Sequence, residues 1–307
     1  MITSTLPRLT ARGYELDTAP QCFGELCPST AIIEDAAALR ERMIEDGYLY
    51  LPQALDREEV FAVRHDLMNI LAEHDYLDPD YPALEGVAKS DEHPPFALNW
   101  AHHVASLQHV LYAGRMMEFF TNFLGGEVRH FDYTWTRAVP PKFGTAPHCD
   151  IVYMGRGTTN LYTAWTPLGD ISYDIGGLMM LENSHRHDKL RNNYGRKDAD
   201  EYCTNRRDDL PQGPGGGGQL KPGGVLSDNP VKLRAGLGGR WLTTEYAAGD
   251  VLIFSVYTVH ASLDNHSNRI RLSSDSRYQL ASEPADERWI GDNPIAHGPQ
   301  AKRGMIC

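Results

Sequence analysis

The sequence predicts an all-β core flanked by N-terminal α-helices. Hydrophobic residues recur at helical spacing in three segments before Leu124, whereas after Gly126 the chain changes to short segments rich in β-branched and aromatic residues. Helices first and strands afterwards are typical of an α+β arrangement, or of an all-β core with a helical flank. Short strands separated by frequent turns favour a sandwich or a jelly roll.

Three helices and one short strand are predicted ahead of Gly126 from apolar spacing and helix-capping residues. Ser29-Thr30 is expected to cap the first helix, which Gly47 ends, and Asp56 is expected to cap the second. A third helix ends at the glycine pair that follows it. In order, the segments are a helix up to 46, a strand over 48–52, a helix over 57–71, a proline-rich loop over 78–95 and a helix over 107–124.

The β part is predicted from short runs of apolar and β-branched residues between turn signals. A buried strand that starts at Val251 is expected to end in His260. The next strand is predicted over Ile270 to Leu280 and has Arg271 near its start. The charged and then glycine-rich stretch 186–240 is expected to be a lid-like insertion at one rim of the core, or a solvated insertion without a role. The other predicted strands cover 128–139, 151–153, 160–168 and 177–181.

The chain divides into an arm, one domain and a tail. Residues 1–30 lack sustained periodicity and are expected to form an extended arm, either on the surface or across a partner subunit in a homodimer. A single domain is predicted over 31–285, including the insertion at 186–240, and 286–307 is predicted as a C-terminal tail. At 307 residues the chain can bury a sizeable core.

Composition restricts the partners and the compartment. A net charge of −12 argues against a nucleic-acid or anionic-membrane partner. The sequence has neither an apolar run of about 20 residues nor a secretory signal, so a cytoplasmic protein is expected. Five cysteines without a Cys-x-x-Cys pair indicate neither a disulfide framework nor a zinc–thiolate site.

A metal site is the chemical prediction. Residues two apart on a strand share a face, so His148 and Asp150 are expected to face one metal ion. His260 is expected to be the third ligand, which gives a set of two histidines and one carboxylate. This ligand set leaves coordination positions open, which suits an Fe(II) oxygenase. A second His-x-Asp copy, His130-Phe-Asp132, competes; the first copy is preferred because it lies where a loop enters the scaffold.

An anion site is expected next to this metal site. Arg271 has a planar fork of donors that matches a carboxylate, and Ser273 lies two residues further along the same strand. Arg277 is interpreted as structural because it is more distant from His260 in sequence. Trp165 is expected to point into the β core. Two further histidines, His185 and His187, could contact substrate or simply lie on the surface.

These residues occur in an order that resembles the phytanoyl-CoA dioxygenase family of Fe(II)- and 2-oxoglutarate-dependent oxygenases. The resemblance extends from about residue 31 to 282. It is strongest in Pro147-His-Cys-Asp150, Trp165-Thr-Pro-Leu-Gly-Asp170, Gly176-Gly-Leu-Met-Met-Leu-Glu-Asn-Ser-His185, Gly249-Asp-Val-Leu-Ile-Phe254, and His260-Ala-Ser followed by Arg271-Leu-Ser273.

The resemblance implies a cupin-like double-stranded β-helix with helices packed on one side. It implies Fe(II) ligands at His148, Asp150 and His260, and binding of the 2-oxoglutarate C5 carboxylate by Arg271. It places Trp165 near the cosubstrate. The implied reaction consumes O2 and 2-oxoglutarate, releases succinate and CO2, and hydroxylates an unactivated C–H bond. The retained carboxylate at Asp150 argues against a halogenase.

The substrate and three rival functions stay open at this point. A small metabolite or natural-product intermediate is preferred to an acyl-CoA, because acidic residues interleave with the basic residues of 186–201. The rivals are a non-catalytic double-stranded β-helix that binds a ligand, a cupin-like isomerase, and a dioxygenase without a cosubstrate; Arg271 would have no purpose in the last two. Here the family pattern Pro-Gly-Ser-His is Glu182-Asn-Ser-His185, which bears on the substrate rather than on the chemistry.

Overall fold

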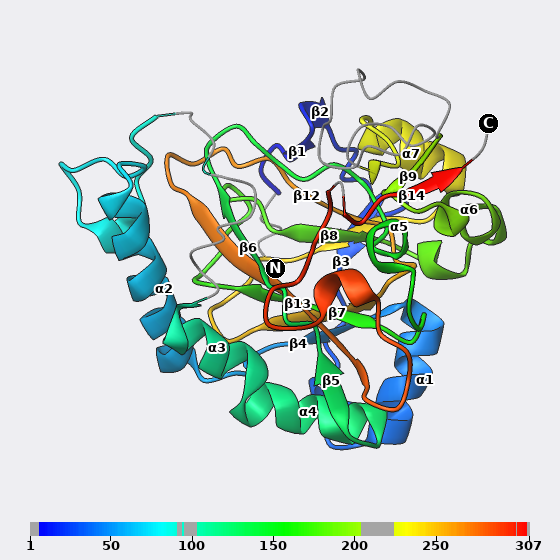
Figure 1. The fold of residues 1–307 in the computed structure, drawn as a ribbon. Helices are drawn as coiled ribbons and strands as arrows, with labels where there is room; N and C mark the ends of the chain where they lie inside the picture. Colours follow the sequence, from blue (N-terminus) through cyan, green and yellow to red (C-terminus); the bar gives the residue numbers. More distant parts are fainter. Residues whose placement is uncertain (1–5, 91–93, 95–102, 204–223, 299, 306–307) are drawn as a thin grey trace.

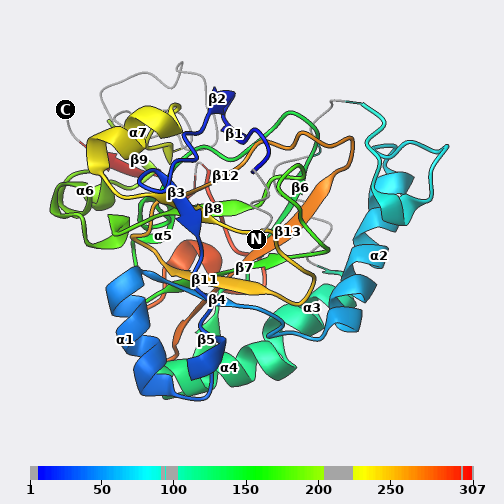
Figure 2. The same cartoon turned by 180° about the vertical axis from the view of Figure 1, so that it is seen from behind.

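The computed structural model describes residues 6–90, 94, 103–203, 224–298 and 300–305. Within these residues, two β-sheets pack against each other and four helices cover the outer face of the larger sheet (Figures 1 and 2). The covering helices are α1 (Ala36–Asp46), α2 (Arg57–Glu73), α3 (Ala105–Tyr112) and α4 (Gly114–Leu124).

The larger sheet has the order β4-β11-β7-β13-β5, with β6 also paired to β13, and all its pairings are antiparallel. The smaller sheet has the order β12-β8-β10-β3. The strands of the larger sheet are β4 (Tyr48–Leu51), β5 (Val128–His130), β6 (Trp135–Val139), β7 (Tyr162–Pro167), β11 (Val251–Ser255) and β13 (Arg271–Leu280). Those of the smaller sheet are β3 (Phe23–Glu25), β8 (Leu178–Leu181), β10 (Trp241–Thr243) and β12 (His260–Ser262).

Alternation along the strands divides the side chains of the larger sheet between two cores. One core lies beneath the helices, which contribute Leu39, Val63, Leu111 and Phe120, and it includes Leu49, Ala164, Ile253 and Leu272 of the sheet. The other core lies between the sheets and includes Tyr50, Trp165, Leu252 and Phe254, opposite Leu178, Met180 and Leu242 of the smaller sheet. The site described below lies at one end of this inter-sheet layer.

Four of the predicted elements are wrong in detail. Asp35, rather than Ser29, caps α1, because the segment Thr30–Ile32 forms a separate 3-10 turn. The third predicted helix is two helices, since Ala113 is extended (φ −141°, ψ −177°) and breaks the chain between α3 and α4. The predicted strand over 128–139 is interrupted between β5 and β6. Residues 151–153 belong to a short helix, α5 (Ile151–Met154), instead of a strand.

His260 also lies in a different place from the one predicted. The strand that begins at Val251 ends at Ser255, and the chain crosses to the smaller sheet before His260 begins β12. His260 and Arg271 therefore belong to strands of opposite sheets. The predicted cap at Asp56 is confirmed, since its carboxylate accepts hydrogen bonds from the amides of Glu58 and Glu59 at the start of α2.

The arm lies against the chain's own smaller sheet. Its hairpin, β1 (Thr10–Ala11) and β2 (Tyr14–Glu15), precedes β3, which pairs in parallel with β10. Apolar arm residues pack on the outer face of that sheet, among them Leu9, Leu16 and Phe23. The arm is therefore held at separate points by buried apolar side chains.

The described part of the insertion carries structure of its own. It contains α6 (Asp188–Asn192), a 3-10 turn (Tyr194–Arg196), β9 (Glu201–Cys203) and α7 (Pro230–Leu237). Strand β9 pairs in parallel with β14 (Arg303–Met305) of the C-terminal tail. The tail also contains a 3-10 turn, Glu287–Trp289, in which Arg288 and Trp289 are buried. The glycine-rich run of the insertion lies outside the described residues.

Candidate metal centre and adjoining pocket

Two histidines are brought together by a backbone bridge between segments far apart in the sequence. His148 and His260 exchange two antiparallel hydrogen bonds, each with an N···O distance of 3.0 Å. The bridge sets their imidazole rings side by side, with centroids 4.1 Å apart. Both side chains are buried.

Asp150 joins them through a helical turn. Its backbone is helical (φ −66°, ψ −24°) and directly precedes α5, so the chain turns into a helix here instead of continuing as a strand. Oδ1 of Asp150 lies 3.7 Å from Nε2 of His148 and 3.7 Å from Nε2 of His260. One ligand atom from each of the three residues lies within 4.8 Å of the others. The predicted residues meet, although the strand alternation used to predict this is wrong.

Hydrogen bonds fix the orientation of both imidazoles. Nδ1 of His148 lies 2.8 Å from the carbonyl oxygen of Ala146, and Nδ1 of His260 lies 3.1 Å from that of Thr258. Because a carbonyl can only accept, each Nδ1 carries the proton, and the lone pair of each Nε2 is directed toward Asp150. Such bonds are usual for histidines that bind a metal.

Asp150 uses its two oxygens differently. Oδ2 accepts hydrogen bonds from Oγ1 of Thr163 at 2.5 Å and from Nη2 of Arg277 at 3.0 Å. Oδ1, by contrast, faces the two histidines. The carboxylate is therefore oriented to offer one oxygen to a metal ion.

Arg277, which the sequence predicts to be structural, lies at the centre of the site. It is buried, its guanidinium carbon lies 4.1 Å from the ring centroid of Trp135, and it donates a hydrogen bond to the carbonyl of Asp275. The sequence carried a usable signal, because Arg271, Ser273 and Arg277 alternate on one face of β13. The distance of Arg277 from His260 in sequence therefore does not report its contact with Asp150.

The protonation states suit metal binding. Burial and the neighbouring His260 lower the pKa of His148 to about 3. Burial likewise lowers the pKa of His260. Burial acts to raise the pKa of Asp150, but Arg277 and the two histidines outweigh it and hold that pKa well below its usual value. At neutral pH the site therefore consists of two neutral imidazoles and one carboxylate. This ligand set is typical of the Fe(II) sites of non-heme oxygenases.

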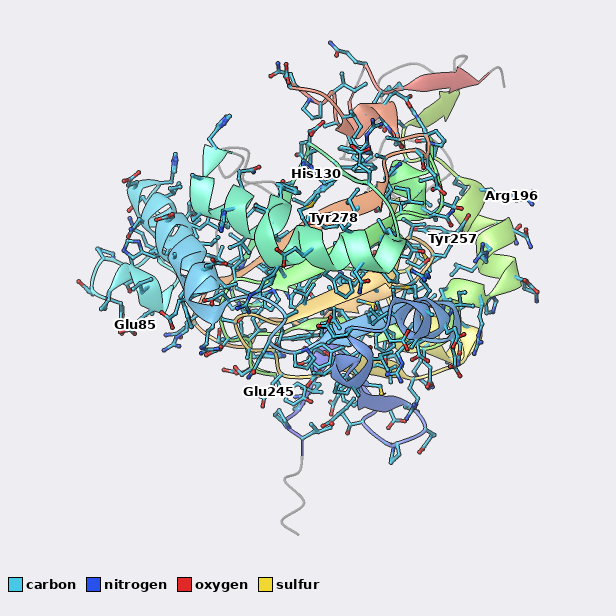
Figure 3. The ribbon with its side chains drawn as sticks, turned by 90° about the horizontal axis from the view of Figure 1, so that it is seen from below. Glu85, His130, Arg196, Glu245, Tyr257 and Tyr278 are labelled. Carbon is cyan, nitrogen blue, oxygen red and sulfur yellow. The ribbon has the colours of Figure 1, made fainter. Side chains whose placement is uncertain are left out.

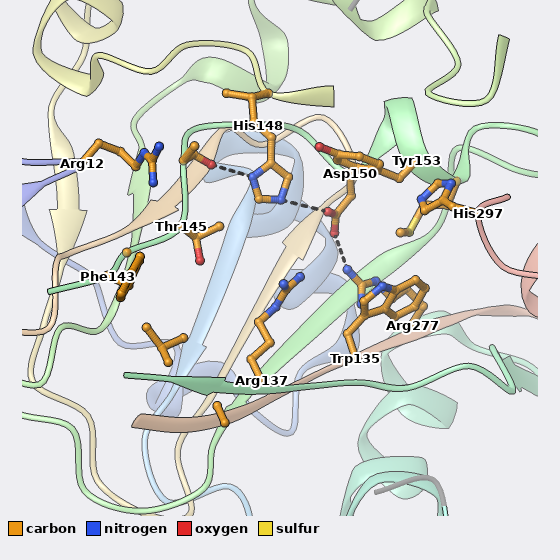
Figure 4. A pocket seen from close by; sticks show the side chains of 16 residues that line it. Arg12, Trp135, Arg137, Phe143, Thr145, His148, Asp150, Tyr153, Arg277 and His297 are labelled. Atoms are coloured by element: carbon orange, nitrogen blue, oxygen red, sulfur yellow. Dashed lines mark hydrogen bonds and ion pairs between the residues drawn. The ribbon is translucent and has the colours of Figure 1, made fainter. Parts of the chain in front are cut away.

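A pocket of about 340 Å³ opens beside His148 and Asp150 (Figure 4). Its polar groups stand at separate points on the wall: Arg12, Arg137, Tyr153, Arg277 and His297. Between them the wall is largely apolar and includes Trp135, Val139, Phe143, Met154 and Val225. Its volume lies within the usual range for small-molecule sites.

Three of these pocket residues come from segments in which the sequence predicted no function. Arg12 lies in the arm and His297 in the tail, while Tyr153 was expected in a strand and lies in α5. No local motif marks them, because their position at the pocket depends on how the arm and tail pack. Only the structure places them.

Arg271, Ser273 and Trp165 are buried in the layer between the sheets and do not line this pocket. Nη1 of Arg271 donates to the carbonyl of Gly176. Among the described residues, Nε and Nη2 of Arg271, Oγ of Ser273 and Nε1 of Trp165 have no hydrogen-bond partner. Burial and the nearby Arg137 lower the pKa of Arg271 to about 10, so it is cationic at neutral pH. Buried donors without partners are rare, and here they fit an anionic ligand such as a carboxylate.

The competing His-x-Asp copy does not form such a cluster. Nδ1 of His130 hydrogen-bonds to the carbonyl of Phe131 and lies 3.9 Å from Asp132. The ring of His130 stacks on Tyr112 at 4.1 Å, beneath α3 and α4, where His130 pairs with Tyr278 (Figure 3). Among the described residues it belongs to no group of three metal-ligand side chains.

The two histidines after β8 are structural. Nε2 of His185 hydrogen-bonds to the carbonyl of Ile44, and its ring fills the space where a Cβ on Gly47 would stand. His187 caps α6 by accepting a hydrogen bond from the amide of Leu190. Neither lines the pocket.

Comparison with known proteins identifies the family. Residues 43–273 match the family described as phytanoyl-CoA dioxygenase (PhyH), so the chain belongs to it. 1-Deoxypentalenic acid 11-beta-hydroxylase from Streptomyces exfoliatus is 26% identical over 273 residues, which cover 82% of this chain and 84% of that protein. The predicted family is confirmed.

Two crystal structures from nogalamycin biosynthesis share the fold. The epimerase SnoN, in complex with Fe3+, alpha ketoglutarate and nogalamycin RO, has a TM-score of 0.52 and 20% identity, covering 86% of this chain and 95% of that one. The non-heme alpha ketoglutarate dependent carbocyclase SnoK has a TM-score of 0.56 and 17% identity, and the match covers 85% of this chain and 90% of SnoK.

The protein is therefore an Fe(II)- and 2-oxoglutarate-dependent oxygenase. It oxidises a C–H bond of a small molecule with O2 and releases succinate and CO2, as the sequence predicts. In the part of the chain that the structure describes, no helix has the length and apolar character needed to cross a membrane.

Proposed function

We propose that His148, Asp150 and His260 hold the iron and that the enzyme hydroxylates an apolar small molecule bound in the adjoining pocket. The observation that carries the proposal is the convergence of two Nε2 atoms and one carboxylate oxygen in a buried site whose hydrogen bonds orient all three. When bound there, iron supplies the oxidation of a C–H bond coupled to decarboxylation of 2-oxoglutarate.

Arg271 and Ser273 would bind the carboxylate of 2-oxoglutarate that is distant from the metal. Nε and Nη2 of Arg271 provide a two-pronged donor, and Oγ of Ser273 lies on the same face of β13. These three atoms have no hydrogen-bond partner among the described residues, which supports this role. The indole Nε1 of Trp165, buried in the same layer, is an additional donor to the cosubstrate.

The two packed sheets and the helical flank fit a double-stranded β-helix, or jelly roll, of the cupin type, in a single domain that consists of residues 31–285 together with β3 of the arm. The insertion at 186–240 would serve as a lid. Two contacts support that role: Val225 lines the pocket, and the amide of Leu226 donates to the carbonyl of Pro147, next to His148.

The apolar walls favour a small ring-containing metabolite over an acyl-CoA as substrate. A pocket of about 340 Å³ encloses a small molecule, whereas the nucleotide of CoA would have to lie outside it. Hydroxylation is the proposed outcome, in keeping with the hydroxylase named among the relatives. Epimerisation and ring formation are the alternatives that the names of SnoN and SnoK represent.

Anaerobic addition of Fe(II) and 2-oxoglutarate tests the proposal. Binding of the cosubstrate to the metal through two oxygen atoms produces a weak visible absorption band. We expect this band to reach full intensity at one Fe(II) per protein chain. Arg271→Ala should move the band to higher 2-oxoglutarate concentrations. Well-folded wild-type protein that shows no band at saturating Fe(II) and 2-oxoglutarate would contradict the proposal.

A further inference from the structure

We propose that Arg12, in the N-terminal arm, anchors the carboxylate of the substrate at the pocket. The enzyme would then act on apolar, ring-containing carboxylic acids. This inference rests on the proposed function, because it concerns the substrate of the same site. It gives the arm a role in substrate recognition.

Within the described part of the chain, Arg12 differs from the other two pocket arginines because its guanidinium has no hydrogen-bond or ion-pair partner. Arg277 is paired with Asp150 at 3.0 Å, and Arg137 with Asp275 at 2.5 Å. The guanidinium of Arg12 forms no hydrogen bond or ion pair with any of the described residues. It is thus the pocket arginine whose charge is available to a ligand.

The backbone that carries Arg12 is fixed. Oδ1 of Asp264 accepts a hydrogen bond from the Arg12 amide at 2.8 Å, and Oδ2 accepts one from Gly13 at 2.8 Å and one from Oγ1 of Thr10 at 2.7 Å. Asp264 is buried and follows β12, the strand that begins with His260. The turn at Arg12 is therefore tied to the segment that carries a metal ligand.

Two local features show that this turn is closely specified. Arg12 has φ +54°, a left-handed conformation that is unfavourable for a non-glycine residue. On the other side of Asp264, a Cβ added to Gly144 would lie 2.7 Å from Oδ1, so the pocket wall packs directly against the carboxylate that holds the turn. The fixed backbone means that this turn need not be ordered when the exposed Arg12 side chain binds an anion.

The position of Arg12 within the pocket determines which part of a substrate it meets. Figure 4 shows Arg12 on the same side as Phe143 and Thr145, with His148 and Asp150 between that side and Tyr153 and His297. A carboxylate held by Arg12 leaves the apolar body of the molecule against the apolar walls beside His148. One guanidinium matches one carboxylate, whereas the several phosphates of CoA would need more cations.

The test compares acids with their methyl esters. The probes are 1-deoxypentalenic acid and other multi-ring terpenoid carboxylic acids, each paired with its methyl ester, and the protein is the anaerobic complex with Fe(II) and 2-oxoglutarate. Dissociation constants are measured by equilibrium dialysis for the wild type, Arg12→Gln and Arg12→Lys. Arg8→Gln is the matched control, because Arg8 lies in the same arm but pairs with Glu15 away from the pocket.

We expect at least one acid to bind the wild type more tightly than its ester. Arg12→Gln should weaken that binding about tenfold, the usual size of a charge-assisted hydrogen-bond loss. Arg12→Lys should fall between the two, and Arg8→Gln should match the wild type. The affinity for esters and the 2-oxoglutarate absorption band should be the same in all four proteins.

Equal affinity for every acid and its ester, no binding of any acid, or an equal loss for acid and ester in Arg12→Gln would each overturn the anchor. The absorption band separates this failure from that of the proposed function. If the wild type shows the band but no preference for acids, only the substrate inference fails. If the band is missing from the wild type, the proposed function fails with it.

Discussion

Nη2 of Arg277 lies 3.0 Å from Oδ2 of Asp150, and this is the carboxylate oxygen that does not face the histidines. The guanidinium therefore orients the carboxylate and stabilises its charge in a buried site. Loss of such a supporting contact typically lowers metal affinity by 10- to 100-fold. We predict that Arg277→Gln weakens Fe(II) binding within about this range, measured by anaerobic calorimetry.

The control for Arg277→Gln is Arg40→Gln, which removes a guanidinium that bonds to the carbonyl of Phe123 in the helical flank. It should leave Fe(II) affinity unchanged. An Arg277→Gln protein that binds Fe(II) as tightly as the wild type would show that Arg277 only packs against Trp135.

Thr163 supports the same oxygen of Asp150 through its hydroxyl, at 2.5 Å. Thr163→Val keeps the shape of the side chain and removes this donor. We predict a loss of about 1 kcal/mol, or about fivefold, in Fe(II) affinity. Thr163→Ser, which restores a hydroxyl, should recover most of it. Equal losses for both variants would assign the effect to packing.

Arg271 is predicted to cost the protein stability when no cosubstrate is bound. It is buried, and two of its nitrogens have no hydrogen-bond partner in the part of the chain that the structure describes. Arg271→Met should therefore raise the free energy of unfolding of the ligand-free protein by about 1–3 kcal/mol. The same variant should lose 2-oxoglutarate binding but retain Fe(II) binding. Denaturant titration and calorimetry measure the two effects.

A lower stability of Arg271→Met without ligand would mean that Arg271 holds the sheets together through its bond to Gly176. Arg64→Met is a matched control. Arg64 donates to the carbonyl of Leu168 outside the inter-sheet layer, and its loss should not affect 2-oxoglutarate binding.

The ligand-free protein should lose stability between pH 7 and pH 5. His148, with a pKa lowered to about 3, stays neutral when folded but takes up a proton below about pH 6.5 when unfolded. The unfolded state then binds more protons, so the free energy of unfolding falls by up to about 1.4 kcal/mol per pH unit for this histidine. The lowered pKa of Asp150 acts only at lower pH, through the normal titration range of a carboxylate.

Denaturant titrations at pH 7 and pH 5 measure this dependence. His148→Asn should reduce the loss of stability between the two pH values, whereas His65→Asn, at an exposed position on α2, should not. Parallel pH dependence in the wild type and His148→Asn would show that His148 is protonated in the folded protein.

The three residues that the sequence predicts as metal ligands converge in the structure, but not through the geometry on which the prediction rests. Strand alternation cannot describe His148 and Asp150, because Asp150 has a helical backbone and directly precedes α5. A short helix of four residues has too few turns to leave a periodic signal in the sequence. The ordered set of motifs predicted the family correctly, because it depends on residue types and their order and not on local conformation.

Residues that reach the pocket from other segments could not be predicted. Arg12 depends on Asp264, about 250 residues later in the chain, and no local pattern reports a contact of that separation. His297 depends on the tail, where Arg288 forms ion pairs with Asp198 and Asp200 of the insertion. Both positions follow from tertiary packing.

Binding of one Fe(II) per chain by the three proposed ligands is the central claim, and metal stoichiometry in matched variants tests it most directly. Anaerobic Fe(II) titration should give one site in the wild type and in His130→Ala, which removes the histidine of the competing copy. His148→Ala and His260→Ala should retain their fold by circular dichroism and lose the site. Loss of the site in His130→Ala, with retention in His148→Ala, would contradict the account.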